Sequence, residues 1–163
     1  MTIEISKTAK ISPHADIEDS VRGSRIVIGD ETVIDSFVKF KPAGGSGDVI
    51  IGSRTTINSG CVLYTGNGIV IGDDVAIAAN CTFAPTNHAF EKKDTIIREQ
   101  RFKPSKGGII IEDDVWIGAG CVLLDGAILR QGCVIGAMSL VRGQVPAYSI
   151  YAGNPLKLIG KRT

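Results

Sequence analysis

A repeat of six residues constrains this chain more than any other feature. An aliphatic residue or phenylalanine returns at every sixth position, in six groups of three. The groups are Ile5, Ile11 and Ile17; Ile28, Ile34 and Phe40; Ile51, Ile57 and Leu63; Ile71, Ile77 and Phe83; Ile111, Ile117 and Leu123; and Leu129, Ile135 and Val141. A helix would place apolar residues three and four apart, so this period is not helical. Because six is a multiple of the strand period, the pattern predicts short strands joined by turns.

A second position in each unit predicts a closed coil. Four residues after the repeated residue, the side chain is never large or charged. This second position holds Ala9, Ala15, Val21, Thr32, Val38, Thr55, Cys61, Val75, Cys81, Val115, Cys121, Ala127, Cys133, Ser139 and Val145. Both positions fall on one face of a strand, and turn-forming Gly, Asp, Asn and Ser stand between them. We therefore expect three units to close a triangular coil, and about six coils to stack into an all-β prism.

The insertions between units predict that one corner of the prism differs from the others. Every irregular step falls after the third member of a group, so all inserted residues should leave the prism at the same corner. The longest insertion, about residues 85–108, is long enough to require a functional reason. It displays His88, one of two histidines in the chain.

Composition limits the partners and the location. The chain has 163 residues, 44% of them hydrophobic, which suits a single domain spanning 1–163. The net charge is +1 and no basic run is present, so we expect no nucleic-acid partner. The N-terminus has no apolar segment of signal-peptide length, and no segment is apolar for long enough to cross a bilayer. We expect a cytoplasmic protein without membrane insertion.

The cysteines follow the repeat. All four occupy the small second position of a unit: Cys61, Cys81, Cys121 and Cys133. This placement predicts buried apolar thiols rather than disulfides or nucleophiles. Their spacing matches the coil and no metal-ligand pattern, so we expect no metal. Unpaired thiols also fit a reducing compartment.

The segment DDVWIGAGCVLLDGAILRQGCVIGAMSLVRGQVPAYSIYAGNPLKLI resembles the hexapeptide-repeat acyltransferases. The resemblance extends from Ile5 to about Lys161, and it implies a left-handed parallel β-helix with an extruded loop and a C-terminal cap at about 146–163. The left hand comes from the resemblance alone, since general crossover rules favour the right hand. The chain is most similar to the galactoside/maltose and polysaccharide O-acetyltransferases. That similarity implies a homotrimer, acetyl-CoA as co-substrate and active sites between neighbouring subunits.

Alignment of IGDDVAIAANCTFAPTNH with this group places the family's catalytic histidine on His88. A neutral imidazole can remove the proton from an acceptor hydroxyl as the acetyl group is transferred. The oxyanion that forms needs hydrogen-bond donors. The CoA thiolate leaves readily, so we expect direct transfer without a covalent enzyme intermediate. Spacing alone leaves open that His88 is an ordinary loop residue.

Three further residues are candidates for the acceptor side or the oxyanion. Asn58 aligns with a family asparagine near the acceptor, although asparagine also favours the turn position that it occupies. Asn87 is often glycine in sugar-acetylating relatives, and Gly66 stands where those relatives can carry an acidic acceptor contact. Glu91, like the other carboxylates of the loop, could accept a hydrogen bond from His88. These departures leave the identity of the acceptor open.

The donor side is assigned from the resemblance. Trp116, the only tryptophan, falls at a turn position outside the prism, where the family lines its groove with a tryptophan. The pantetheine arm of CoA suits backbone groups at Ala119 and Ala137. Four basic residues are candidates for the CoA phosphates, namely Arg142, Lys157, Lys161 and Arg162.

The expected function is acetyl transfer to a sugar hydroxyl. A surface-polysaccharide precursor is favoured, because the N-terminal helical segment of maltose-type relatives is missing before Ile5. One alternative is an N-acetyltransferase of an amino nucleotide-sugar, whose acceptor needs less help from a base. A γ-type carbonic anhydrase would need three histidine ligands, and this chain has two. A non-catalytic trimeric scaffold is the last alternative, and the intact loop argues against it.

Overall fold

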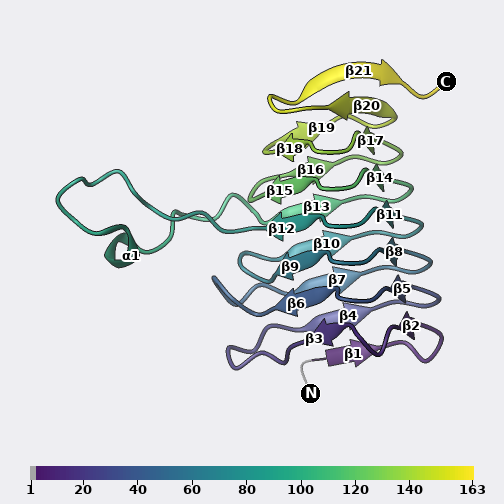
Figure 1. Ribbon diagram of the computed structural model, residues 1–163, viewed down its shortest axis with the longest axis horizontal. Helices are drawn as coiled ribbons and strands as arrows, with labels where there is room; N and C mark the ends of the chain where they lie inside the picture. The colour runs from purple at the N-terminus through teal and green to yellow at the C-terminus, as the bar shows by residue number, and fades with distance from the viewer. Residues whose placement is uncertain (1–2) are drawn as a thin grey trace.

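The computed structural model describes residues 3–163 as a stack of coils with three parallel sheets along its sides (Figure 1). Residues 1 and 2 of the predicted domain lie outside this range. Sheet A contains β1 (Ile3–Ile5), β4 (Ile26–Ile28), β7 (Val49–Ile51), β10 (Ile69–Ile71), β13 (Ile109–Ile111), β16 (Ile128–Leu129) and β19 (Gln144–Val145). Sheet B contains β2 (Lys10–Ile11), β5 (Val33–Ile34), β8 (Thr56–Ile57), β11 (Ala76–Ile77), β14 (Trp116–Ile117), β17 (Val134–Ile135), β20 (Ser149–Ala152) and β21 (Lys157–Lys161). Sheet C contains β3 (Asp16–Ile17), β6 (Lys39–Lys41), β9 (Val62–Tyr64), β12 (Thr82–Ala84), β15 (Val122–Leu124) and β18 (Leu140–Val141).

The chain visits the sheets in the order A, B, C, and the register stacks each repeated residue on its equivalent in the next coil. Ile51, for example, pairs with Ile28 on one side and Ile71 on the other. From the second coil onward these side chains are 2% exposed or less, so the interior core that the repeat predicts is confirmed. The three corners of a coil are named here by the sheets that they join: the AB, BC and CA corners.

The first coil departs from the prediction. Ile5 is 41% exposed, and Ile11 and Ile17 are only partly buried, because no coil lies beneath them. Val21 was expected inside the prism and is 99% exposed. The reason is that the chain has already left the prism after β3, so Val21 belongs to an insertion and not to a coil.

The four cysteines lie inside the prism, as predicted. Each is fully buried and has a free thiol. Cys61, Cys81 and Cys121 stack at the BC corner, where each thiol donates to a backbone carbonyl oxygen on the next coil at 3.2–3.3 Å. Burial raises the pKa of Cys133 to about 12. No cluster of three or more metal-binding side chains occurs within residues 3–163.

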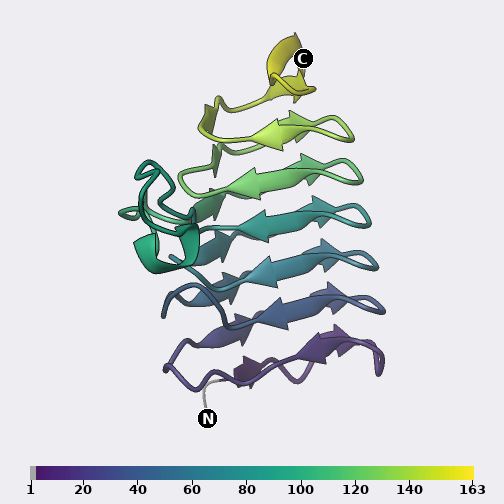
Figure 2. The same ribbon diagram turned by 60° about the vertical axis from the view of Figure 1, so that its left-hand side comes forward.

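The insertions all lie at the CA corner, as predicted. They occupy residues 18–25, 42–48, 65–68 and 85–108, each between a strand of sheet C and the next strand of sheet A. The longest projects far from the prism and carries α1 (Ile97–Gln100), as Figures 1 and 2 show. At the C-terminal end, β21 pairs antiparallel with β20. In the described part of the chain, no helix has the length and apolar character to cross a bilayer.

Candidate active site

The projecting loop begins and ends as a short two-stranded ribbon, formed by residues 87–89 and 101–103. His88 and Phe102 are antiparallel bridge partners in it. The Ala89 N–H donates to the Arg101 carbonyl at 3.0 Å, and the Lys103 N–H donates to the Asn87 carbonyl at 2.8 Å. These bonds fix the backbone of His88 although the rest of the loop extends into solvent.

His88 opens into a hollow where the ribbon meets the prism. The hollow, here called the His88 hollow, has a volume of about 290 Å³ and is lined by Ala43, Gly44, Tyr64, Ala84, Thr86, His88 and Phe102. The imidazole centroid lies 4.8 Å from that of the Phe102 ring. Within residues 3–163 the imidazole has no hydrogen-bond partner. Imidazole is the side chain that enzymes use most often for proton transfer, and here it faces the hollow.

A glycine of the CA corner packs against Thr86, one of the residues that line this hollow. Gly66 has a φ of +42° and is buried against Thr86. A Cβ added to Gly66 would lie well under 3.0 Å from the Thr86 hydroxyl oxygen. The acidic contact expected from the resemblance therefore has no room at this position, and any acceptor must be recognised by other groups.

Asn87 lies on the opposite side of the ribbon from His88. Neighbouring residues of an extended strand point to opposite faces. Asn87 accordingly lines a second hollow of about 230 Å³, here called the basic hollow. The residues of the basic hollow are Asn87, Phe90, Lys103, Lys106, Leu124, Asp125 and Arg142.

Glu91 is engaged by Lys103 instead of His88. Its carboxylate forms an ion pair with the Lys103 ammonium and accepts a hydrogen bond from the Phe90 N–H at 3.0 Å. The same ammonium lies 4.2 Å above the centroid of the Phe90 ring. The hydrogen bond from Lys103 holds the pKa of Glu91 at about 2, well below its ordinary range. Such a carboxylate is a weak base, and the structure does not bring it to the imidazole.

Asn58 lies at a different corner from His88. It follows β8 at the BC corner, and its side-chain amide donates to the Ile77 carbonyl at 2.7 Å. The ribbon that carries His88 follows β12 at the CA corner. A strand of sheet C separates the two corners within one chain, so a single chain does not bring Asn58 and His88 together.

The residues assigned to the donor lie along sheet B and the BC corner. Trp116 was expected in a turn, but it is the first residue of β14, between Ala76 and Val134 of the adjacent strands. It still faces outward, with 55% of its surface exposed. Ala119 and Ala137 occupy equivalent, exposed turn positions on successive coils. The Ala119 carbonyl accepts a hydrogen bond from the Met138 N–H at 2.8 Å.

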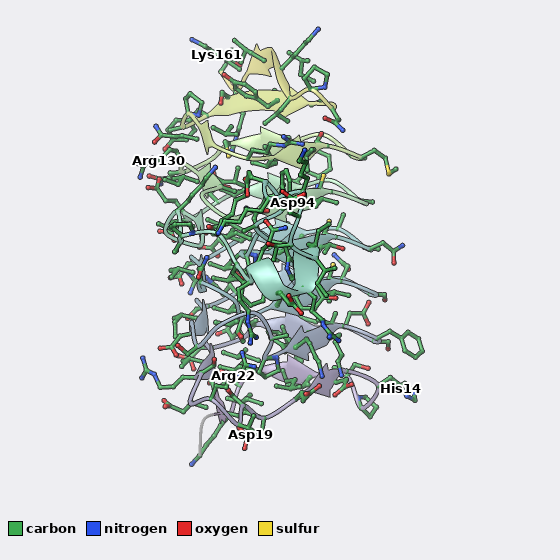
Figure 3. All side chains as sticks on the ribbon, turned by 90° about the vertical axis from the view of Figure 1, so that its left-hand side faces the viewer. His14, Asp19, Arg22, Asp94, Arg130 and Lys161 are labelled. Atoms are coloured by element: carbon green, nitrogen blue, oxygen red, sulfur yellow. The ribbon has the colours of Figure 1, made fainter. Side chains whose placement is uncertain are left out.

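The four basic residues assigned to the CoA phosphates do not form one cluster. Arg142 lines the basic hollow at the CA corner. Lys157 and Lys161 lie at opposite ends of β21, and Figure 3 shows Lys161 at the end of the stack remote from His14. Arg162 forms an ion pair with Asp114 at 2.8 Å and donates to a backbone carbonyl at 2.9 Å.

Comparison with known proteins places this architecture in a family. Residues 108–143 match the family described as "Bacterial transferase hexapeptide (six repeats)", and residues 48–82 match "Hexapeptide repeat of succinyl-transferase". The structure is similar to that of a mutant of AntD, an N-acyltransferase from Bacillus cereus, in complex with dTDP-4-amino-4,6-dideoxyglucose and Coenzyme A. The TM-score is 0.82 at 28% identity, covering 99% of this chain and 84% of that one. Two segments of this chain therefore carry the hexapeptide repeat of bacterial transferases. The predicted left-handed parallel β-helix is thereby confirmed.

Two relatives in sequence extend the comparison. The probable acetyltransferase Rv3034c of Mycobacterium tuberculosis is 30% identical over 140 residues, or 86% of this chain. WbbJ of Escherichia coli K12, a candidate lipopolysaccharide biosynthesis O-acetyl transferase, is 28% identical over 124 residues, or 73% of this chain. The hexapeptide-repeat region shared with them spans 43% and 63% of their respective lengths.

Three lining residues of the His88 hollow carry little signal in the sequence. Phe102 meets His88 only because the loop returns on itself, and no repeat marks that pairing. Tyr64 reaches the hollow from β9, and Thr86 lies on the segment that leads into the ribbon. The sequence marker for Thr86 is its place in PTNH, two residues before His88.

Proposed function

We propose that this protein is an acetyl-CoA-dependent acetyltransferase that acts on a sugar hydroxyl, with His88 as general base. The observation that carries the proposal is the exposed imidazole in the His88 hollow, free of hydrogen bonds within residues 3–163, on a ribbon that fixes its backbone. Each subunit is a single domain, 1–163. The loop at 85–108 carries the base, and the segment at 146–163 caps the stack.

The chemistry requires one proton transfer and one acyl transfer. His88 takes the proton from the acceptor hydroxyl while the oxygen attacks the thioester carbonyl. The tetrahedral oxyanion is stabilised by N–H donors. The candidate side chain is Asn58 from a neighbouring subunit, because Asn87 faces the other side of the ribbon. Collapse expels the CoA thiolate, which takes up a proton. General-base assistance of this kind contributes roughly 10²–10⁴ in rate.

The donor side fits the exposed groups of sheet B and the BC corner. The indole of Trp116 faces outward where it can contact an extended ligand. Backbone groups at Ala119 and Ala137 are exposed one coil apart, which suits the amides of a pantetheine arm. Of the candidate phosphate ligands, Lys157 lies nearest to this corner, since it pairs with Ala152 at the end of β20. Lys161 and Arg162 lie farther away.

The separation of these groups supports a homotrimer. Reacting atoms must approach to about 3–3.5 Å. His88 is at the CA corner, Ala119 is at the BC corner, and the intervening strand alone spans roughly 10 Å. A donor held at the BC corner of one subunit can reach His88 of another. The projecting loop exposes Ile96 and Ile97, at 60% and 56%, which a neighbouring subunit would cover.

A second candidate is N-acyl transfer to a nucleotide-linked amino sugar. The similarity to the AntD complex, at a TM-score of 0.82 over nearly the whole chain, favours it. The difference lies in the nucleophile: a neutral amine attacks with less assistance from a base than a hydroxyl does. The similarity to WbbJ favours a hydroxyl of a surface-polysaccharide precursor. Use of acetyl-CoA and the unpaired thiols favour a cytoplasmic location.

The test is release of free CoA thiol from acetyl-CoA against matched acceptors. One set presents sugars with hydroxyls only, and the other presents the corresponding nucleotide-linked amino sugars. Turnover with hydroxyl acceptors that depends on His88 supports O-acetylation. Turnover confined to amines supports the second candidate. Lack of turnover with both sets, in a folded trimer that binds acetyl-CoA, would refute the proposed function.

A further inference from the structure

The basic hollow has no part in the proton and acyl transfers described above. It lies on the side of the ribbon opposite His88, between the returning end of the loop and the CA corner of the next coils. Asn87 and Phe90 come from the outgoing part of the loop, and Lys103 and Lys106 from its return. Arg142 comes from the turn after β18, so residues far apart in sequence converge on one small space.

The one carboxylate in the lining is held by hydrogen bonds from three amide groups. Asp125 is 3% exposed. Its oxygens accept from the Gly108 N–H at 2.8 Å, the Lys106 N–H at 2.8 Å and the Asn67 side-chain amide at 3.2 Å. Asp125 therefore anchors the backbone of the returning loop, and within residues 3–163 it forms no ion pair with a cation of the hollow.

Two cations in the lining have no counter-ion. The third, Lys103, is paired with Glu91 outside the lining. The stem of Lys106 lies against Gly126, where an added Cβ would be 3.0 Å from the Lys106 Cβ. Within residues 3–163, neither the Lys106 ammonium nor the Arg142 guanidinium forms an ion pair. Together with the Asn87 amide, they supply the donors and the positive charge that a phosphate group requires.

We propose that the basic hollow binds a phosphate group of a substrate through Lys106 and Arg142. A volume of about 230 Å³ accommodates a phosphate or diphosphate, while sites that enclose a whole small molecule begin at roughly 300 Å³. The remainder of the ligand would extend out of the hollow. Because Asn87 and His88 are adjacent, a phosphate held there also fixes the ribbon that presents the base. The inference rests on the proposed function for the identity of the substrates: CoA and a nucleoside-diphosphate sugar both carry this chemistry.

Binding measurements test the proposal without turnover. Isothermal titration calorimetry on the full-length protein would use two probes, CoA and thymidine diphosphate. Arg142→Gln and Lys106→Gln each remove one cation from the hollow. Lys93→Gln is the matched control, because Lys93 is exposed on the same loop and lies outside the lining. Loss of a charged hydrogen bond should weaken the affected probe about tenfold in each hollow variant. The control should bind like the wild type.

The two probes separate the sources of phosphate. Weaker binding of CoA alone assigns the hollow to the donor, and weaker binding of thymidine diphosphate alone assigns it to a nucleotide-linked acceptor. Arg142→Lys keeps the charge and should recover part of the affinity, which separates recognition from a folding defect. The proposal is overturned if neither probe weakens in the hollow variants, if Lys93→Gln weakens binding equally, or if the wild type binds neither probe. His88→Ala should leave the affinities for both probes unchanged. A wrong assignment of the catalytic base would therefore be distinguished from a wrong assignment of the phosphate site.

Discussion

The BC and CA corners of the prism both connect a strand of one sheet to a strand of the next, but their backbones differ. At the BC corner the turn has the same length in successive coils, and its third residue adopts a positive φ of 60–74°. The residues at this position are Phe37, Gly60, Asn80, Gly120 and Met138. At the CA corner the connection differs from coil to coil and reaches its greatest length at residues 85–108. The BC corner is therefore a repeated backbone, whereas the CA corner is a set of individual structures stacked on one another.

This difference separates two kinds of function. A repeated turn presents the same backbone groups at regular intervals, which suits an extended donor lying along the stack. An individual insertion can place one side chain where the repeat has none, which suits a base and a charged recognition site. The contacts that hold the CA corner are correspondingly specific: a buried carboxylate, Asp125, and glycines in close contact with backbone.

The sharpest test of this comparison substitutes the two histidines, one at each corner. His88→Ala should lower kcat by roughly 10²–10⁴ with little change in the affinity for acetyl-CoA, because a base acts in the transition state. His14→Ala is the control: His14 is exposed at the BC corner of the first coil, against Phe37. Acetyl-CoA consumption by the wild type and the two variants measures the effect, and the loss of rate should appear in His88→Ala only. An unchanged kcat in a folded His88→Ala protein would remove His88 from the mechanism.

Two glycines of the CA corner test whether its insertions are packed by backbone contact. A Cβ on Gly45 would meet the Gly66 carbonyl oxygen, which cannot move aside as a flexible side chain would. Gly45→Ala should therefore lower the free energy of unfolding by about 1–3 kcal/mol. At Gly143, an added Cβ meets nothing within 4 Å, so Gly143→Ala should change the free energy of unfolding by less than about 0.5 kcal/mol. Thermal or denaturant unfolding measures both, and equal effects would show that packing does not distinguish the two positions.

The same contrast explains what the sequence could predict. The six-residue period fixed the strands and the core, because each aliphatic side chain must stack on its equivalent. The period also located the CA corner, because the residues inserted at irregular steps must leave the prism. It misplaced Val21, because a small residue at the right spacing looks internal even after the chain has left the coil. Trp116 was placed outside the prism correctly, but it belongs to a strand and not to a turn.

The surroundings of His88 could not be predicted in the same way. The pairing of His88 with Phe102 depends on how the loop returns, and a loop without periodicity gives no register. Resemblance to the family predicted a catalytic role for His88 but gave no sign that Glu91 is held by Lys103. The basic hollow joins residues from Asn87 to Arg142, and only the stacking of two coils brings them together.

The cysteines test the interior of the regular coils. Cys121 is fully buried at the BC corner, and its thiol donates to the Gly136 carbonyl at 3.2 Å. Substitution of Cys61, Cys81, Cys121 or Cys133 singly by Ala should cost about 0.5–3 kcal/mol of stability and leave turnover largely intact. Burial raises the pKa of Cys133 to about 12, so its thiolate is scarce at neutral pH and this thiol should react slowly with a thiol reagent in the folded protein. Complete loss of activity in a folded Cys81→Ala protein would instead identify a nucleophile.

The smallest expected effect concerns the ion pair of Glu91 with Lys103 at the base of the loop. The pKa of Glu91 is lowered from 4.5 to about 2, so the stabilisation that the pair gives the ribbon is present above pH 4.5 and is lost as the pH falls toward 2. Both side chains are accessible to solvent, and screening keeps the contribution of the ion pair small.

Amide hydrogen exchange measures this contribution locally, at Ala89 and Lys103, whose N–H groups close the ribbon. In Glu91→Gln these amides should exchange a few-fold faster than in the wild type at pH 6, and the difference should shrink at high salt or near pH 2. Glu99→Gln, at an exposed carboxylate on α1, should leave both amides unchanged. Equal exchange in Glu91→Gln and the wild type at pH 6 would show that backbone hydrogen bonds alone hold the ribbon, and that even the CA corner is shaped without its charges.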